Sequence, residues 1–314
     1  GDGLTQAALR ATALAGELDA VLDAPAAVGA RLLQPGVRGF TCQVVPFDVG
    51  TTLRGIMASR PAAWIFTSAT LAVAGDFSHF TTRMGLVERC DTLAIDSPFD
   101  YPQQALLYLP EGLPDPATAA HGDAVIETAA GLAEISAGGA FLLFTSHRAL
   151  AAAAKRLRER WGTGSEARLH LLAQGESPRE QLLREFREHG NAVLLGTASF
   201  WEGVDVPGNA LRLVVIDRLP FASPEDPVLR ARAQHRREEG GNPFNDFQLP
   251  EAAIVLKQGV GRLIRSEEDR GVVAILDPRL TRKGYGKQLL AALPPMRRTR
   301  DLLEVRQMLA RCSG

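Results

Sequence analysis

Apolar and polar positions divide the chain of 314 residues into two regions with different patterns. Residues 4–33 carry Ala and Leu at helical spacing, while Cys42–Phe47 and Ala63–Thr67 have the composition of short strands. Prolines then cluster between positions 98 and 116, a turn-rich stretch that marks a domain boundary. We therefore predict one domain over residues 1–95 and a second over residues 96–314.

From residue 123 onward, helical patterns alternate with short, almost continuously apolar runs. Such runs are typical of strands buried on both faces, so the pattern predicts an α/β fold in which helices cover both faces of a parallel sheet. In that architecture, ligands bind beyond the carboxyl ends of the strands. The predicted helices are 123–136, 147–161, 178–188, 225–238 and 249–265, and the predicted strands are 140–145, 168–172, 192–196, 211–216 and 271–276.

Composition narrows the class of protein. With 46% hydrophobic residues the chain can bury a sizeable core, and 35 basic against 36 acidic residues mean that any nucleic-acid contact must come from a local groove. Cys42, Cys90 and Cys312 are too far apart for a CxxC metal site and fit a reducing compartment, so no metal site is expected. The sequence contains no apolar run long enough to span a membrane, and its start at Gly1 suggests a fragment.

Four residues near the end of the chain share one face of the predicted helix 249–265. Gln258, Gly261, Arg262 and Arg265 have offsets of zero, three, four and seven, which at about 100° per residue form a polar stripe. Two guanidinium groups one turn apart suit a phosphate group. The alternative is a solvated helix edge, although apolar residues cover most of the remaining circumference.

A second polar cluster follows the predicted strand 192–196. Thr197 and Ser199 can hold a nucleic-acid phosphate, and Glu202 and Asp205 can accept hydrogen bonds from a ribose or from arginines. Taken singly, each of these residues is equally well explained as a turn former or a cap.

Two further hydroxyl groups follow predicted strands. Ser146 opens a helix, where it serves either as an N-cap or as a ligand of a phosphate. Ser68 and Thr70 are turn formers on local grounds.

Other segments carry weaker signals. Gly259-x-Gly261 lies inside a helical pattern, so a dinucleotide fingerprint is poorly supported. Phe221 suits either a base contact or a satellite core, and the arginines at 297, 298 and 300 are expected to open a solvated helix. The chain lacks a GxxxxGK[ST] phosphate loop and an Asp-Glu pair after a strand, so it holds half of a nucleotide site.

Five motifs in order give the chain a resemblance to a known family. They are SAT at 68–70, FTSHRAL at 144–150, GTASFWEGVDVPG at 196–208, RLPFASPEDP at 218–227 and QGVGRLIR at 258–265. The set resembles the later motifs of superfamily 2 DNA helicases of the XPD-like group, DinG/YoaA branch. The resemblance implies that residues 96–314 form a RecA-like sheet, the second motor domain. Residues 1–95 would be the end of an inserted helical region and of the first motor domain.

The resemblance also implies roles for individual residues. Gln258, Arg262 and Arg265 would be catalytic at the γ-phosphate, and Glu202, Gly203 and Asp205 would bind the nucleotide. DNA binding or coupling would involve Ser68, Thr70, Ser146, Thr197 and Ser199.

Function follows from the resemblance as an expectation. The family couples ATP hydrolysis with Mg²⁺ to 5′-to-3′ movement on single-stranded DNA or forked duplexes, and it carries an iron–sulfur cluster in the first domain. The phosphate loop, the DEAH-like motif and the cluster cysteines are absent here, so the chain alone would be inactive. A bacterial, cytoplasmic, nucleoid-associated protein is implied. The alternatives are a non-catalytic nucleic-acid-binding or partner module of the same fold and a parallel-sheet enzyme with a nucleotide cofactor.

Overall fold

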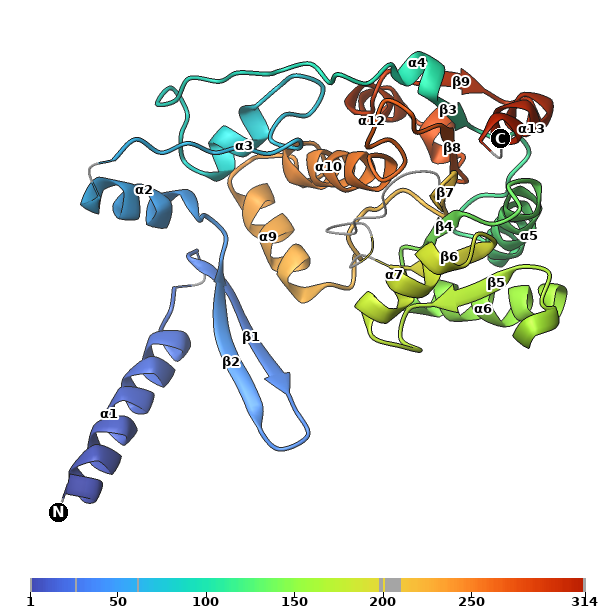
Figure 1. The fold of residues 1–314 in the computed structure, drawn as a ribbon. Coiled ribbons are helices and arrows are strands. Elements are labelled where there is room, and N and C mark those ends of the chain that lie inside the picture. Colours follow the sequence, from blue (N-terminus) through green and yellow to red (C-terminus); the bar gives the residue numbers. More distant parts are fainter. Residues whose placement is uncertain (1, 26, 61, 198–199, 201–209, 313–314) are drawn as a thin grey trace. The chain divides into compact units, whose positions relative to one another are not determined.

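The chain forms two compact units in a computed structural model that describes residues 2–25, 27–60, 62–197, 200 and 210–312 (Figure 1). The first unit comprises residues 1–72, 76–93 and 221–250, and the second comprises 73–75, 94–220 and 251–314. Residues 221–250, which we expected in the second domain, belong by their contacts to the first unit.

The second unit is built on a seven-stranded sheet whose neighbouring strands all run parallel, as predicted. The strand order is β5-β6-β4-β7-β8-β3-β9. Because every strand points the same way, the loops that follow them all lie at one edge. The strands are β3 Ala105–Tyr108, β4 Ala140–Leu143, β5 His170–Ala173, β6 Ala192–Gly196, β7 Leu213–Ile216, β8 Gly271–Ile275 and β9 Arg297–Thr299.

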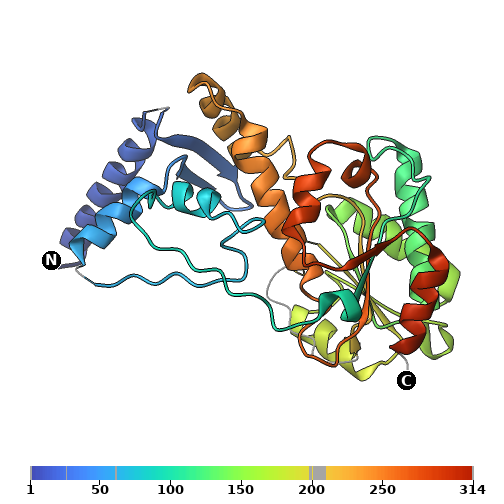
Figure 2. The ribbon, with the colours of Figure 1, turned by 90° about the horizontal axis from the view of Figure 1, so that it is seen from above.

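Helices cover both faces of this sheet (Figure 2). On one face, side chains such as Leu142 pack with the buried residues of α5 (Ala119–Ile135), α6 (His147–Trp161) and α13 (Leu302–Arg311). Successive side chains of a strand point to opposite faces, so Phe141 points the other way. There its ring meets Phe186 of α7 (Arg179–Glu188), with ring centroids 4.7 Å apart. The remaining helices of this unit are α4 Tyr101–Gln104, α10 Leu249–Val260, α11 Arg279–Arg282 and α12 Gly286–Ala292.

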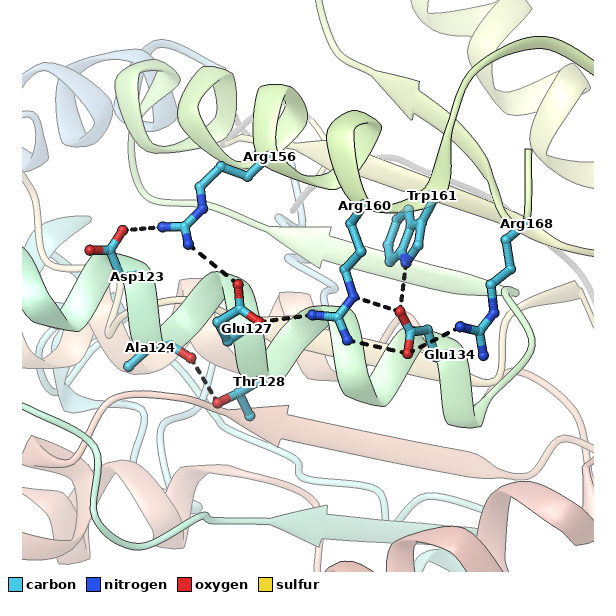
Figure 3. Close-up of polar contacts among 9 residues, drawn as sticks. All are labelled: Asp123, Ala124, Glu127, Thr128, Glu134, Arg156, Arg160, Trp161 and Arg168. Carbon is cyan, nitrogen blue, oxygen red and sulfur yellow. Dashed lines mark hydrogen bonds and ion pairs between the residues drawn. The ribbon is translucent and has the colours of Figure 1, made fainter. Parts of the chain in front are cut away.

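The outer surface of α5 and α6 carries a ladder of charged side chains (Figure 3). Arg160 Nε donates to Glu134 Oε1 at 2.7 Å, Trp161 Nε1 donates to the same oxygen at 2.9 Å, and the Arg160 guanidinium also reaches Glu127. These bonds to Arg160 and Trp161 lower the pKa of Glu134. Most of the other partners are well exposed, so each of those pairs contributes at most about 1 kcal/mol.

One prediction for the carboxyl-terminal region is wrong. The arginines at 297 and 298 belong to edge strand β9, which pairs with β3 at Leu106 and Leu107, and no helix opens there. Charged side chains are common on edge strands because they discourage further pairing. The helix α13 begins at Leu302, where Asp301 accepts a hydrogen bond from Leu303 N at 2.8 Å.

The first unit contains a two-stranded hairpin, β1 Gly29–Pro35 and β2 Phe40–Pro46, paired antiparallel. The strand expected over Cys42–Phe47 is thus present, whereas the helical pattern of residues 4–33 overestimates the length of the helix. The helix α1 (Asp2–Leu22) ends earlier, because the following segment pairs with β2. The helices α2 Gly50–Ser59, α3 Ser78–Arg83 and α9 Pro227–Glu238 complete the unit, and Phe47 stacks on His235 of α9 at 4.7 Å between ring centroids.

The expected strand Ala63–Thr67 is absent. These residues are exposed and irregular, and no strand in the described ranges of the chain pairs with them. A strand needs a neighbour for its backbone hydrogen bonds, so apolar composition alone does not produce one.

Candidate functional site

Polar side chains meet at the carboxyl edge of the parallel sheet. Thr197 directly follows β6, and its backbone N–H donates to Gln174 Oε1 at 2.7 Å. Its hydroxyl also donates to this oxygen at 3.0 Å and lies 3.4 Å from His147 Nε2. Gln174 directly follows the neighbouring strand β5, so the two loop starts are tied together. Sequence reasoning found Thr197 but missed Gln174, although its position after a strand was a usable signal.

Ser146 lies at the same edge, after β4, as the N-cap of α6. Its Oγ accepts a hydrogen bond from Ala149 N at 3.2 Å, so the capping role considered from sequence is confirmed. Ser146, His147 and Arg148 are exposed. A helix N-terminus beside a hydroxyl and an arginine favours anions, so a phosphate contact here stays a prediction.

Among the described acids at this edge, Asp217 has the most strongly perturbed pKa. It follows β7, and its carboxylate accepts hydrogen bonds from Thr145 N at 3.0 Å and from Thr145 Oγ1 at 3.3 Å. Burial raises the pKa of Asp217 to about 7, against the opposing effect of Arg218 and of the hydrogen bonds to the carboxylate. Asp217 therefore fixes the loop that leads to Ser146. Sequence analysis did not single it out, because a lone Asp after a strand is a common turn residue.

Asp277 has a similar role at the neighbouring strand. It follows β8, its side chain is buried, and it accepts hydrogen bonds from Leu219 N at 2.8 Å and from the Arg279 guanidinium at 2.6 Å. The segment after β7 is thereby held against the end of β8. Together with Gln174 and Asp217, this residue connects the loops of neighbouring strands across the sheet.

The polar stripe predicted on one helix is not formed. The helix α10 ends at Val260, so only Gln258 lies on it, while Gly261, Arg262 and Arg265 lie in the following loop. The physical reason is a change of hydrogen-bond partner: Arg265 N and Ser266 N donate to Asp269 Oδ2 at 2.7 and 2.9 Å. Glycines beside the last helical residue also favour ending the helix there.

This arginine loop, residues 261–270, has an anchored backbone. The amide nitrogen of Gln104 donates to Ser266 O at 2.8 Å and to Asp269 O at 3.0 Å, and both Gln104 and Asp269 are buried. Gln104 directly precedes β3, and the loop directly precedes β8. The loop therefore lies at the amino edge of the sheet, opposite Thr197 and Ser146, and the structure does not bring these two sets of residues together.

Gln258 stands near the end of α10, half-buried. Its Oε1 is shielded from solvent and has no hydrogen-bond partner among the described residues. A buried amide oxygen without a donor is costly, and a role for Gln258 at a phosphate stays a prediction.

Comparison with known proteins assigns the chain to a family. Residues 130–296, more than half of the chain, match the family described as the helicase C-terminal domain. The chain belongs to this family. It is 46% identical over 276 residues to the ATP-dependent DNA helicase YoaA of Escherichia coli, an alignment that covers 87% of the chain and 42% of YoaA.

One further relative supports the assignment of this helicase C-terminal domain to the XPD-like DinG/YoaA branch, and one solved structure supports its fold. The ATP-dependent helicase DinG of Mycobacterium tuberculosis is 40% identical over 276 residues, which cover 86% of the chain and 40% of DinG. The solved structure of Xpd4 from S. tokodaii has a TM-score of 0.51 at 15% identity and covers 83% of the chain and 50% of that protein. This second likeness concerns the fold, which is RecA-like. The chain spans about two fifths of the length of these curated relatives.

Some predicted site residues of the helicase domain lie away from the two edges described above. Ser68 and Thr70 belong to the first unit, where they form a local turn: Thr70 N donates to Ser68 Oγ at 3.1 Å. Ser199, Glu202, Gly203 and Asp205 lie outside the described residues, so their roles stay predictions.

Neither a metal-binding cluster nor a membrane-spanning helix occurs in the described ranges. Within them, no group of three or more His, Cys, Asp or Glu side chains is arranged to hold a metal ion. In those same ranges, no helix has the length and apolar character needed to cross a membrane.

Proposed function

We propose that the chain is the C-terminal portion of an ATP-dependent DNA helicase, containing the second motor domain and the end of the first. Its relatives YoaA and DinG carry the names of ATP-dependent helicases, and YoaA is named as acting on DNA. The chain spans about two fifths of each, so the activity proposed is that of a longer protein. We expect movement from 5′ to 3′ on single-stranded DNA and no ATP turnover by this chain alone.

The anchored arginine loop is the observation that carries this proposal. Asp269 and Gln104 fix the backbone of the loop that carries Arg262 and Arg265, so the positions from which these side chains start are set by the fold. Arginine charge at the γ-phosphate stabilises the transition state of phosphoryl transfer. We assign ATP as the substrate of this loop, with Gln258 beside it.

The opposite edge of the sheet is proposed to face DNA. Ser146 and Arg148 are exposed there at the start of α6. The hydroxyl of Thr197 lies 3.4 Å from Nε2 of His147, the residue between them. Hydroxyl groups and helix N-termini bind phosphates without regard to base sequence, as a translocating motor requires. Ser199 is expected to extend this contact, and Ser68 and Thr70 to couple it to the nucleotide.

The implied metals are not assigned to this chain. The described residues contain no cluster of metal ligands for the Mg²⁺ or the iron–sulfur cluster that the resemblance implies.

The test is the Arg265→Ala variant of the longer helicase that contains this chain. We expect its DNA-stimulated ATP turnover to fall by about a thousandfold or more, because an arginine at the γ-phosphate contributes on that order. Single-stranded DNA binding should persist. Arg311→Ala, which removes an exposed arginine from α13, is the matched control and should retain full activity.

Two outcomes would refute the proposal. Unchanged turnover in Arg265→Ala would remove the arginine from the reaction. A wild-type protein that binds single strands but shows no DNA-stimulated ATPase would favour the alternative of a non-catalytic nucleic-acid-binding module. Substrates with only a 5′ or only a 3′ single-stranded tail test the direction of movement separately.

A further inference from the structure

The arginines of α9 in the first unit fall into two pairs with different surroundings. Arg232 lies over the ring of Phe247, 4.1 Å from its centroid. Arg236 donates to Asp246 at 2.6 Å and to Glu239 at 3.3 Å. These two arginines therefore hold α9 against the π-helical turn Phe244–Gln248, and Arg236 also contacts the C-cap residue of its own helix.

Arg230 and Arg237 form the other pair. Both are exposed, and neither makes an ion pair with any described residue. They are seven positions apart in the sequence, so they share one face of the helix about 10 Å apart along its axis. They line the same surface cavity of about 630 Å³, together with Gln234, Gln248, Pro224 and Pro227.

Most carboxylates of this segment are engaged by groups other than Arg230 and Arg237. Asp226 caps α9 by accepting from Val228 N at 2.8 Å, while Asp246 and Glu239 are engaged by Arg236. Glu238 accepts a hydrogen bond from Gln234 Nε2 at 2.8 Å and makes no ion pair with either arginine. Among the residues that the structure describes, no acidic side chain lines the cavity. Two unneutralised guanidinium groups beside amide side chains make a site for anionic oxygens.

We propose that this cavity binds the phosphate backbone of a single-stranded nucleic acid, with Arg230 and Arg237 each contacting a phosphate. Because the two arginines start about 10 Å apart along the helix axis, each can contact a phosphate of its own, and a polymer presents several. Arginine also matches phosphate geometry in a bidentate manner. The inference rests on the proposed helicase function and adds a contact to it, on α9, in a segment separate from the edge that carries Thr197 and Ser146.

The experiment compares the full chain with its Arg230→Gln/Arg237→Gln double variant. Binding to a fluorescein-labelled oligothymidine of about twenty nucleotides is followed by anisotropy between about 50 and 200 mM salt. We expect the affinity to fall about tenfold or more. The slope of log K against log salt should become shallower by about 1.4, because each phosphate contact on a single strand contributes about 0.7.

The control is the Arg10→Gln/Arg311→Gln variant, which removes the same charge from exposed positions on α1 and α13. It should keep the wild-type affinity and slope, and all variants should keep the far-ultraviolet circular dichroism spectrum of the wild type. If the control loses as much affinity as the α9 variant, general charge explains the binding and the inference is overturned.

The remaining outcomes separate this inference from the proposed function. Wild-type binding with no change in the α9 variant would overturn the cavity assignment and leave the helicase proposal intact. Failure of the wild-type chain to bind the oligonucleotide would count against both. Equal displacement of the oligonucleotide by polyglutamate would show a surface for any polyanion and would overturn the assignment to nucleic acid. Weaker displacement by polyglutamate and by inorganic phosphate is the supporting result.

Discussion

Replacement of Asp217 by Asn should change how the stability of the parallel-sheet unit depends on pH. The carboxylate is buried after β7, and burial raises its pKa from an ordinary 3.8 to about 7. A raised pKa means that the folded state holds its proton more tightly than the unfolded state does. The stability from this group is therefore fully present below pH 3.8 and is lost as the pH rises through about 7.

The magnitude follows from the two ionisation constants. Each tenfold change in an ionisation constant is worth about 1.36 kcal/mol, so a rise from 3.8 to about 7 corresponds to about 4 kcal/mol in all. Roughly 2.5 kcal/mol of this is lost between pH 5 and pH 8. Asn cannot ionise, yet its oxygen can still accept from Thr145 N and its amide can donate to Thr145 Oγ1.

The assay is urea unfolding of the wild type and of Asp217→Asn at several pH values from 5 to 8. We expect the free energy of unfolding of the variant to rise, relative to that of the wild type, by roughly 2 to 3 kcal/mol across this range. Gln288→Ala, which changes an exposed side chain that does not ionise, is the control and should show no such trend. A difference between Asp217→Asn and wild type that stays constant with pH would refute the reasoning.

Two further changes test the packing around the sites. Gln104→Leu removes the donors to Ser266 O and Asp269 O and should lower the free energy of unfolding by about 2 kcal/mol, because buried carbonyls lose their partners. Gln288→Leu, at an exposed position, is its control, and equal urea midpoints for the two variants would contradict the anchoring role of Gln104. Phe186→Ala should lower the free energy of unfolding by about 3 to 5 kcal/mol, because it opens a cavity against Phe141. Phe40→Ala, at an exposed position, should lower it far less, and a small decrease in Phe186→Ala would show that α7 packs loosely against the sheet.

The local pattern predicts most of the second unit. The helix 147–161 and the strand 192–196 occur with the predicted limits, and the parallel sheet with helices on both faces is confirmed. Periodicity succeeds here because the central strands are buried on both faces and the covering helices on one, so neighbouring residues along the chain carry the burial pattern.

The pattern is less reliable where an element needs a distant partner. The segment Ala63–Thr67 looks like a strand but has no paired neighbour among the described residues, and residues 29–33 look helical but pair with β2. Residues of suitable composition adopt either form, and the hydrogen-bond partner decides between them.

For the candidate site, the order of motifs is readable in the amino-acid sequence and by itself points to the helicase family. The placement of the residues is not readable there. Helical spacing puts Gln258, Arg262 and Arg265 on one stripe, but Asp269 and Gln104 draw the arginines into a loop at the amino edge of the sheet. The hydrogen bonds from Gln104 come from a residue far away along the chain, and periodicity, which reports only local burial, contains no record of them.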